Sequence, residues 1–197
     1  NKQKETESAR IPAIDFTGDG KTLIDDVVAL VNYNQSGEFL PASSKVRVPS
    51  SSAAMPSFIT AKDFVVTAGE SASLSVDLSG VGSFTAMSFD IKVPAGLQIA
   101  LDSDGKPNVL SGDLATGKHK LLATQQDKQT IKVVCYAEDN ACVTKDAGSI
   151  IKLRLTADYD MAPDENEQIA LTNTMITKPN LTSVMIDEYL INTGIVN

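Results

Sequence analysis

The sequence predicts a mainly β protein, a two-sheet antiparallel β-sandwich of about nine strands preceded by a short loop and helix. From residue 58 onward, apolar residues alternate with polar residues in short runs, which is typical of strands buried on one face. Turn residues separate these runs, and almost none of the runs has the spacing of a helix. Half-buried strands of this kind pack as two sheets, because each sheet has one apolar face to bury.

The composition of the chain excludes several classes of function. Its 197 residues suffice for one domain of good size and a small appendage. Seventeen basic residues against 25 acidic residues give a net charge of −8, whereas nucleic-acid binding requires clustered Lys and Arg. No apolar run approaches the roughly 18 residues that span a bilayer. We therefore expect neither a nucleic-acid partner nor membrane insertion.

Two segments of low apolar content are predicted to lie outside the folded parts. Residues 1–10 are a polar, flexible N-terminal tail without a hydrophobic signal region. If the protein is exported, its signal was removed upstream of this numbering, and the tail can tether the folded part to a lipid anchor. Residues 41–57 are rich in Ser and Pro, which predicts an extended linker.

Residues 15–26 have the spacing of a calcium-binding loop. Oxygen-bearing residues stand at its first, third and fifth positions, a glycine that permits a sharp turn follows, and an acid occupies the twelfth position. Ca²⁺ takes about six to eight oxygen ligands, and a loop of this spacing can wrap around one ion. The alternative is an Asp–Gly turn that caps a helix. The expected metal ligands are the side chains of Asp15, Thr17, Asp19 and Asp26 and the carbonyl of Lys21.

Residues 11–40 are predicted to contain this loop and one helix. Gly37 is a natural stop signal for the helix. One short helix cannot bury an apolar stripe alone, so this helix must dock on another surface. Apolar residues follow the loop at helical spacing and form one stripe, made of Ile24, Val27, Val28, Leu30 and Val31.

The sandwich itself is predicted over residues 58–197. Gly80, Gly82 and Gly105 belong to the turn signals between its strands. The predicted strands, in chain order, fall within residues 64–67, 73–78, 87–93, 120–123, 131–135, 151–156, 168–172 and 185–190.

The loop and helix resemble one half of a type I dockerin. In that family an Asp-x-Asn-x-Asp-Gly loop with a later Asp leads into a helix that carries Val, Ala and Leu on one face. Asp15, Asp19, Gly20 and Asp26 match this pattern, whereas Thr17 places a neutral hydroxyl where Asn or Asp is usual. A complete dockerin has two such repeats, and this sequence contains one.

The strand region resembles a cohesin, the module to which dockerins bind. The resemblance covers roughly residues 58–197 and implies a jelly-roll type of sandwich and a role in protein–protein assembly, with a dockerin-like or cohesin-like module as partner. It lies in the order of alternating runs and turns across residues 68–77, 84–97, 131–136 and 147–155.

One strand supplies the predicted partner-facing residues. If the apolar residues of 87–93 point inward, Ser88, Asp90 and Lys92 point outward. We predict that these three form part of a sheet face that binds a partner, and the alternative is an ordinary solvated face. Because the second repeat is missing, the helix is alternatively expected to dock within its own chain.

The sequence contains no recognisable catalytic set. His119 is the single histidine, and neither a Gly-x-Ser-x-Gly motif nor a phosphate-binding loop is present. We therefore expect that the protein is not an enzyme and has no catalytic residues. Cys135 and Cys142 flank a predicted turn and could either form a disulfide or remain two separate thiols.

The predicted function is that of a non-catalytic, calcium-binding assembly or adhesion module, secreted or on the surface of a bacterium. The alternative is a carbohydrate-binding sandwich in a surface system that handles glycans, with a polysaccharide as ligand. Sugar-binding platforms use aromatic faces, but this chain has no Trp. Its candidates for such a platform, Tyr136, Tyr159 and Tyr189, are scattered along the sequence.

Overall fold

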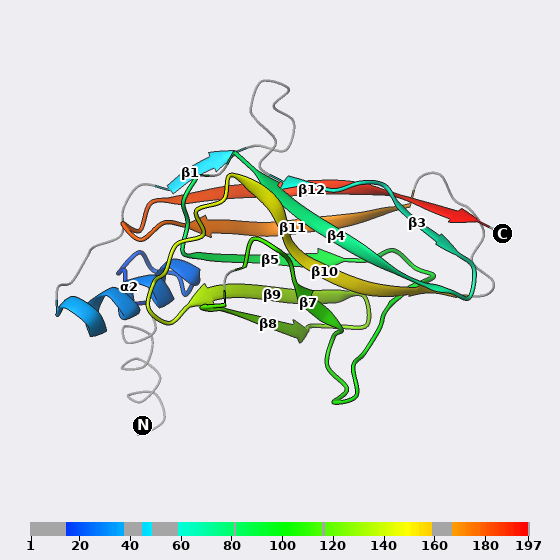
Figure 1. The fold of residues 1–197 in the computed structure, drawn as a ribbon, viewed down its shortest axis with the longest axis horizontal. Helices are drawn as coiled ribbons and strands as arrows, with labels where there is room; N and C mark the ends of the chain where they lie inside the picture. Colours follow the sequence, from blue (N-terminus) through cyan, green and yellow to red (C-terminus); the bar gives the residue numbers. More distant parts are fainter. Residues whose placement is uncertain are drawn as a thin grey trace.

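A computed structural model of the protein describes residues 15–37, 45–48, 59–80, 82–115, 117–158 and 167–196. The predicted tail and most of the predicted linker lie outside these residues. No helix in the described ranges is long and apolar enough to cross a membrane. The elements, labelled as in Figure 1, are α2 (Ile24–Ser36), β1 (Lys45–Val48), β2 (Ile59–Thr60), β3 (Phe64–Thr67), β4 (Ser71–Ser79), β5 (Ala86–Lys92), β6 (Leu97–Ile99), β7 (Val109–Ser111), β8 (His119–Gln125), β9 (Thr130–Ala137), β10 (Ala147–Ala157), β11 (Gln168–Thr177) and β12 (Ser183–Val196).

The strands form the two packed sheets that the sequence predicts. The larger sheet has seven strands in the order β1-β12-β11-β5-β9-β8, with β3 also paired to β12. The smaller sheet has five strands in the order β2-β4-β10-β6, with β7 also paired to β10. Figure 1 shows β4 and β10 crossing over the strands of the larger sheet. The fold class is therefore confirmed as a mainly β sandwich.

The pairing departs from a purely antiparallel sandwich at one strand, β12. Its first residues pair in parallel with β1, from Lys45 opposite Ser183, and its last residues pair in parallel with β3, from Phe64 opposite Thr193. β1 lies inside the segment that the sequence predicts to be a linker. These two short strands cover much of an edge that would otherwise expose unpaired backbone groups.

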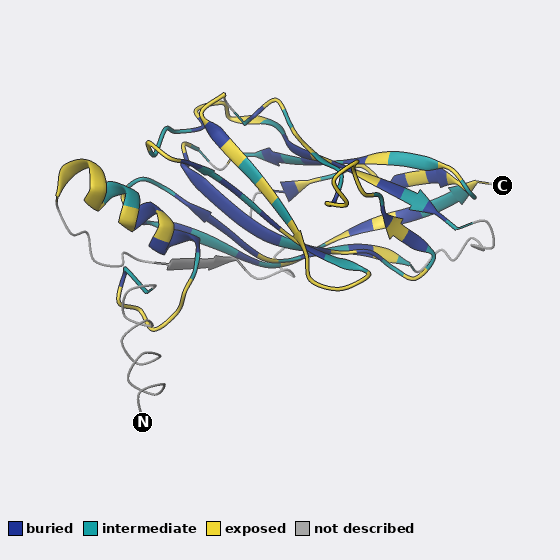
Figure 2. Cartoon of the chain, turned by 90° about the horizontal axis from the view of Figure 1, so that it is seen from below, coloured by how far each residue is buried: buried dark blue, intermediate teal, exposed yellow. Residues whose placement is uncertain are grey.

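The core lies between the two sheets, where the alternation of the sequence predicts it. Met87, Phe89 and Ile91 of β5 are fully buried, as are Leu153 and Leu155 of β10, and all five belong to one apolar cluster. Figure 2 shows this alternation as buried segments along the inner strands. Side chains at every second position point to the same face of a sheet.

A β-bulge in β11 changes which residues of that strand face the core. The register shifts between Thr172 and Met175, where Asn173 adopts a left-handed φ of 52°. Leu171, before the bulge, and Ile176, after it, both pack in the core between the sheets. They are an odd number of residues apart, so a regular strand would place them on opposite faces. A bulge inserts one residue and so reverses the alternation. Met175 therefore lies on the outer face of the larger sheet, among the residues that α2 covers.

The two cysteines are separate thiols. Cys135 points into the sandwich from β9 and is fully buried, whereas Cys142 lies partly exposed in the loop after that strand. Burial raises the pKa of the Cys135 thiol to about 11. Of the two alternatives left open by the sequence, the structure has the unbridged one.

Candidate functional site

The N-terminal loop is folded around its own carboxylates. The backbone N–H groups of Asp19 and Gly20 donate to the two Asp15 carboxylate oxygens, at 3.0 and 2.7 Å. The N–H of Lys21 donates to Asp19 Oδ1 at 2.9 Å. Gly20 has a φ of 82°, a left-handed conformation that favours glycine. The Asp–Gly spacing of the sequence therefore forms a tight turn.

Asp26 fastens this loop to the start of α2. Its Oδ1 accepts bonds from the Thr17 N–H (2.9 Å) and the Thr17 hydroxyl (3.0 Å), and its Oδ2 accepts the Leu23 N–H (2.7 Å). Thr17 and Asp26 are both buried. Leu23 is the N-cap residue and its side chain cannot accept a hydrogen bond. Asp26, in the first turn of the helix, accepts the Leu23 N–H instead, and a negative charge is favoured at this end of a helix.

The donor chemistry of the loop suits a hard cation, although its carboxylates already serve the fold. Each Asp15 oxygen accepts one N–H and retains a second lone pair, and carboxylate, hydroxyl and carbonyl oxygens are the ligands that Ca²⁺ prefers. Within the described ranges, no three or more His, Cys, Asp or Glu side chains are grouped in this structure so as to hold a metal ion. The five expected ligands remain a prediction.

α2 rests on the outer face of the larger sheet, near one end of β5 and β11 (Figure 1). The amide of Asn32 donates to the Pro179 carbonyl at 2.9 Å, and the amide of Asn140 donates to the Val28 carbonyl at 3.2 Å and to Asn32 Oδ1 at 2.7 Å. Polar ties to two loops thus fix the helix at this position. Its buried apolar contacts form a second cluster, made of Ile24, Val28, Ala29, Ala86, Met175 and Leu181.

The predicted apolar stripe of α2 is only partly buried. Ile24 and Val28 face the sheet, whereas Val27 and Leu30 keep 38% and 43% of their surface exposed. Ala29, on the other side of the buried row, is buried instead. Ile24, Val28 and Asn32, each four residues apart, lie on one side of the helix, and the hydrogen bonds of Asn32 hold this side against the sheet. The helix is therefore rotated relative to the stripe that its sequence predicts.

The three predicted partner-facing residues all lie on the outer face of the larger sheet. Ser88 is opposite Val134 in the register and is only 8% exposed, next to the first turn of α2. Asp90 is partly buried, accepts a bond from the Asn173 amide (2.8 Å) and lies 3.5 Å from the Lys132 ammonium. Lys92 is exposed. Of the three, Lys92 is the most accessible to a partner.

A small groove on this face was not predicted. Its volume is about 170 Å³, and it lies beside α2 over β5 and β9. Leu122 of the neighbouring edge strand β8 pairs with Val134 and is 54% exposed, so the apolar surface extends beyond the groove. The sequence contains a signal for this surface: two adjacent apolar residues stand at 121–122 and again at 133–134. Neighbouring residues of a strand point to opposite faces, so one residue of each pair must face outward. The groove is lined by Thr22, Leu23, Ile24, Val27, Ser88, Lys132 and Val134.

His119 and two of the tyrosines that the sequence offered as sugar-binding candidates lie within the described part of the fold. His119 is buried at the start of β8, and burial lowers its pKa below the ordinary value although Asp139 opposes the shift. Tyr136 packs against the α2 cluster, and the Tyr189 hydroxyl accepts the Ala61 N–H at 3.4 Å. Tyr159 lies outside the described residues. Tyr136 and Tyr189 therefore do not form a common aromatic platform.

The chain matches no protein-family model and no curated protein. Among solved structures, it is similar to cohesin modules. One is the non-cellulosomal cohesin of the hyperthermophilic archaeon Archaeoglobus fulgidus, with 17% identity and a TM-score of 0.53, covering 71% of this chain and 90% of that chain. Another is the sixth cohesin of scaffoldin B from Acetivibrio cellulolyticus, solved in complex with a dockerin, with 15% identity, a TM-score of 0.54 and coverage of 70% and 97%.

A third similar structure is the third cohesin of the ScaC protein of Acetivibrio cellulolyticus, solved with a dockerin. It has 11% identity and a TM-score of 0.55, and the alignment covers 78% of this chain and 99% of that chain. At such identities the similarity shows a shared fold. The protein has a cohesin-like β-sandwich.

Proposed function

We propose that this protein is a non-catalytic assembly module whose sandwich binds a partner protein of the dockerin type. The observation that carries the proposal is the cohesin-like fold, since two of the structures described above were solved with a dockerin bound. Fold alone does not determine function. The second support is a surface suited to binding a protein, which lies on the outer face of the larger sheet.

The proposed docking surface is the part of this face that α2 leaves uncovered, together with the adjoining exposed side of α2. It combines exposed apolar side chains, Leu122 on β8 and Val27 on α2, with the polar pair Asp90 and Lys132. Exposed apolar groups beside charged ones are typical of interfaces, where apolar anchors supply affinity and the charged rim supplies orientation. Lys92 extends this rim along β5.

A Leu122→Asp variant tests the docking surface. We expect the intact protein to bind at least one member of a panel of purified dockerin modules, measured by calorimetry with Ca²⁺ present. Leu122→Asp should weaken that binding at least tenfold, because a carboxylate placed against an apolar partner loses its hydration.

The matched control is Leu110→Asp, since Leu110 is 63% exposed but lies on β7 of the other sheet. This variant should bind as the intact protein does. If no dockerin binds, the proposed function is wrong. Equal losses in the two variants would instead place the contact elsewhere.

We also propose that Ca²⁺ binds the N-terminal loop through Asp15, Thr17, Asp19, Lys21 and Asp26. The oxygen donors of the loop and their spacing along the sequence support this. The neutral hydroxyl of Thr17 lowers the charge of the site, which suits the roughly 10⁻⁴–10⁻³ M affinities of extracellular modules. The proposed setting is therefore outside the cell or on its surface.

The calcium proposal predicts a metal-dependent increase in stability. At a Ca²⁺ concentration 100 times the Kd, binding adds about 2.7 kcal/mol to the free energy of unfolding of the part that binds. We expect thermal unfolding of the intact protein to shift upward by several degrees on addition of Ca²⁺, and EDTA should reverse the shift. The variant Asp15→Asn should lose this increment.

Asp102→Asn is the control for the calcium experiment. Asp102 accepts the N–H groups of Asp104 and Lys106, both at 2.9 Å, so its turn resembles the loop at Asp15. The substitution therefore removes comparable turn bonds but should keep the full calcium increment. A Ca²⁺ titration without heat, combined with unfolding that EDTA leaves unchanged, would rule out the site.

We further propose that α2 works as a fixed part of its own sandwich and not as a separate dockerin helix. Its buried contacts with Ala86 and Met175 and the ties from Asn140 support this role. In that arrangement the segment narrows the sheet face available to a partner, because Ser88 becomes buried beside it.

A further inference from the structure

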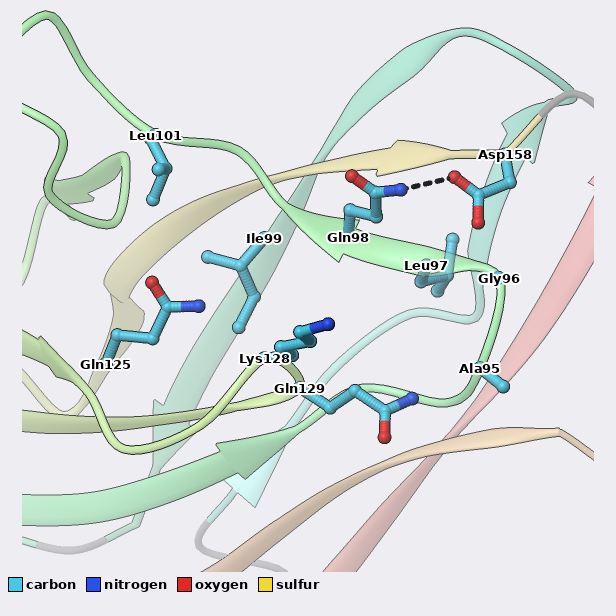
Figure 3. Close-up of a pocket in the computed structure, with 10 residues that line it drawn as sticks. All are labelled: Ala95, Gly96, Leu97, Gln98, Ile99, Leu101, Gln125, Lys128, Gln129 and Asp158. Carbon is cyan, nitrogen blue, oxygen red and sulfur yellow. Dashed lines mark hydrogen bonds between the residues drawn. The ribbon is translucent and has the colours of Figure 1, made fainter.

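A second concave site lies beside the β8–β9 turn, at the start of β9, whereas the Asn140 loop that holds α2 follows the end of β9. Its volume is about 580 Å³, within the roughly 300–1,000 Å³ range of small-ligand sites. Figure 3 shows it between β6, the β8–β9 turn and the end of β10. It is lined by Ala95, Gly96, Leu97, Gln98, Ile99, Leu101, Gln125, Lys128, Gln129 and Asp158.

The two walls of this cleft are held in place by hydrogen bonds of their backbone N–H and carbonyl groups. On one side, Asp127 Oδ1 accepts the Gln129 N–H at 2.8 Å, and the Gln129 carbonyl accepts the Val93 N–H at 2.9 Å. On the other side, the Asp158 N–H donates to the Gly96 carbonyl at 2.9 Å. A site whose walls are already ordered loses little conformational entropy when it binds a ligand.

The side chains of the cleft combine amides with an aliphatic surface. Gln98, Gln125 and Gln129 each carry both a donor and an acceptor, and Leu101 adds an exposed aliphatic patch. The Gln98 amide donates to Asp158 Oδ1 at 2.6 Å, which orients both groups (Figure 3). Hydroxyl groups also donate and accept at once, so amides match a hydroxyl-rich ligand.

The charges of the lining favour a neutral ligand. Among the described residues that line the cleft, Lys128 and Asp158 are the only ones with ionisable side chains, and their formal charges cancel. Asp158 is also partly buried. An anionic ligand would meet this carboxylate, and a cationic ligand would meet the ammonium of Lys128. A neutral molecule avoids both costs.

An extended peptide fits this cleft less well. The Asp158 N–H donates to the Gly96 carbonyl and the Ala100 N–H donates to the Arg154 carbonyl, so the backbone groups of Gly96 and Ala100 face β10. By alternation, those of Leu97 and Ile99 face the other edge of β6, which pairs with no strand in the described residues. The Leu97 N–H is already bonded to the Pro94 carbonyl. A peptide strand would therefore gain about three main-chain bonds at most, which is too few for β-strand addition to give the main affinity.

We propose that this cleft binds a neutral oligosaccharide, with Gln98, Gln125, Gln129 and Asp158 as hydrogen-bonding residues and Leu101 as an aliphatic contact for the C–H face of a sugar ring. The site is separate from the sheet face assigned to a protein partner. Without an aromatic platform, the expected Kd is on the order of 1 mM.

The test is a titration of the ¹⁵N-labelled protein with cellotetraose, xylotetraose, mannotetraose and chitotetraose. We expect at least one of them to shift the side-chain amide signals of the three cleft glutamines in a saturable way, while the Gln168 amide on β11 stays unchanged. A double variant, Gln125→Ala with Gln129→Ala, should weaken that binding about 25-fold, because each of the two lost hydrogen bonds contributes about fivefold.

Gln126→Ala is the matched control, since Gln126 is exposed in the same turn but does not line the cleft. It should bind as the intact protein does. No saturable shift with any of the four saccharides would overturn the proposal. So would a Gln126→Ala loss equal to that of the double variant. Saturable binding of the test peptide (Thr-Val)₄ at the Ile99 amide, without a saccharide response, would assign the cleft to peptides instead.

Discussion

Val28→Asp is expected to release α2 from the sandwich. Val28 is 1% exposed and packs with Ala86 and Met175, so the new carboxylate would be buried without a partner. A buried charge without a partner costs about 3–5 kcal/mol, which is comparable to the stabilisation expected from the few apolar side chains that hold the helix. Hydrogen exchange of the α2 amides should therefore rise to the rate of an unprotected segment, and the melting temperature should fall.

The neighbouring substitution Val27→Asp is the control for this experiment. Val27 keeps 38% of its surface exposed, so the same carboxylate can remain in water and should change the stability by less than about 1 kcal/mol. The order of the two effects is the decisive result. If Val27→Asp were as damaging as Val28→Asp, the helix would be buried on the side that its sequence stripe favours. If neither changed exchange at α2, the helix would not be docked.

Gly112→Ala is expected to destabilise the sandwich by about 3 kcal/mol, at the upper end of what overpacking costs. A Cβ at this position would lie 2.1 Å from the Ser149 carbonyl oxygen and 2.4 Å from its carbonyl carbon. Both are backbone atoms of β10. Neither side can move freely, because Ser149 is bonded to Asp113 through its N–H (2.7 Å) and to Leu114 through its carbonyl (2.9 Å).

Thermal unfolding of Gly112→Ala should therefore begin roughly 6–12 °C below that of the intact protein, for a domain of this size. Gly117→Ala is the control, since no heavy atom lies within 4 Å of its added Cβ. That variant should stay within about 0.5 kcal/mol of the intact protein. Equal melting temperatures for the two variants would mean that β10 is not held against Gly112 as described.

Much of the sandwich follows from the sequence because the side-chain period of a strand is two wherever one face is buried. Met87, Phe89 and Ile91 face the core and their neighbours face outward, as that period requires. The loop is similarly local: the turn at Gly20 and the helix after it depend on residues close together in the chain. Whether Asp15, Thr17, Asp19, Lys21 and Asp26 hold calcium stays a prediction.

The candidate sites depend on contacts that no local pattern contains. The stripe of α2 shows that the helix is amphipathic, but Asn140 and Pro179, more than 100 residues away, decide which side is buried. The bulge at Asn173 reverses the alternation of β11, so period alone would misplace Met175. The cleft of Figure 3 gathers Gln98, the β8–β9 turn and the end of β10.

The sequence by itself therefore determined the alternation of the strands, the turns between them, the Asp–Gly loop and the presence of one amphipathic helix. Each of these depends on the backbone conformation of a few consecutive residues. The tertiary structure alone decided the parallel pairing of β1 and β3 with β12, the rotation of α2 on the sheet and the place of the cleft. These arise where surfaces from distant segments must fit together at close-packed density, and that fit is a property of the whole fold.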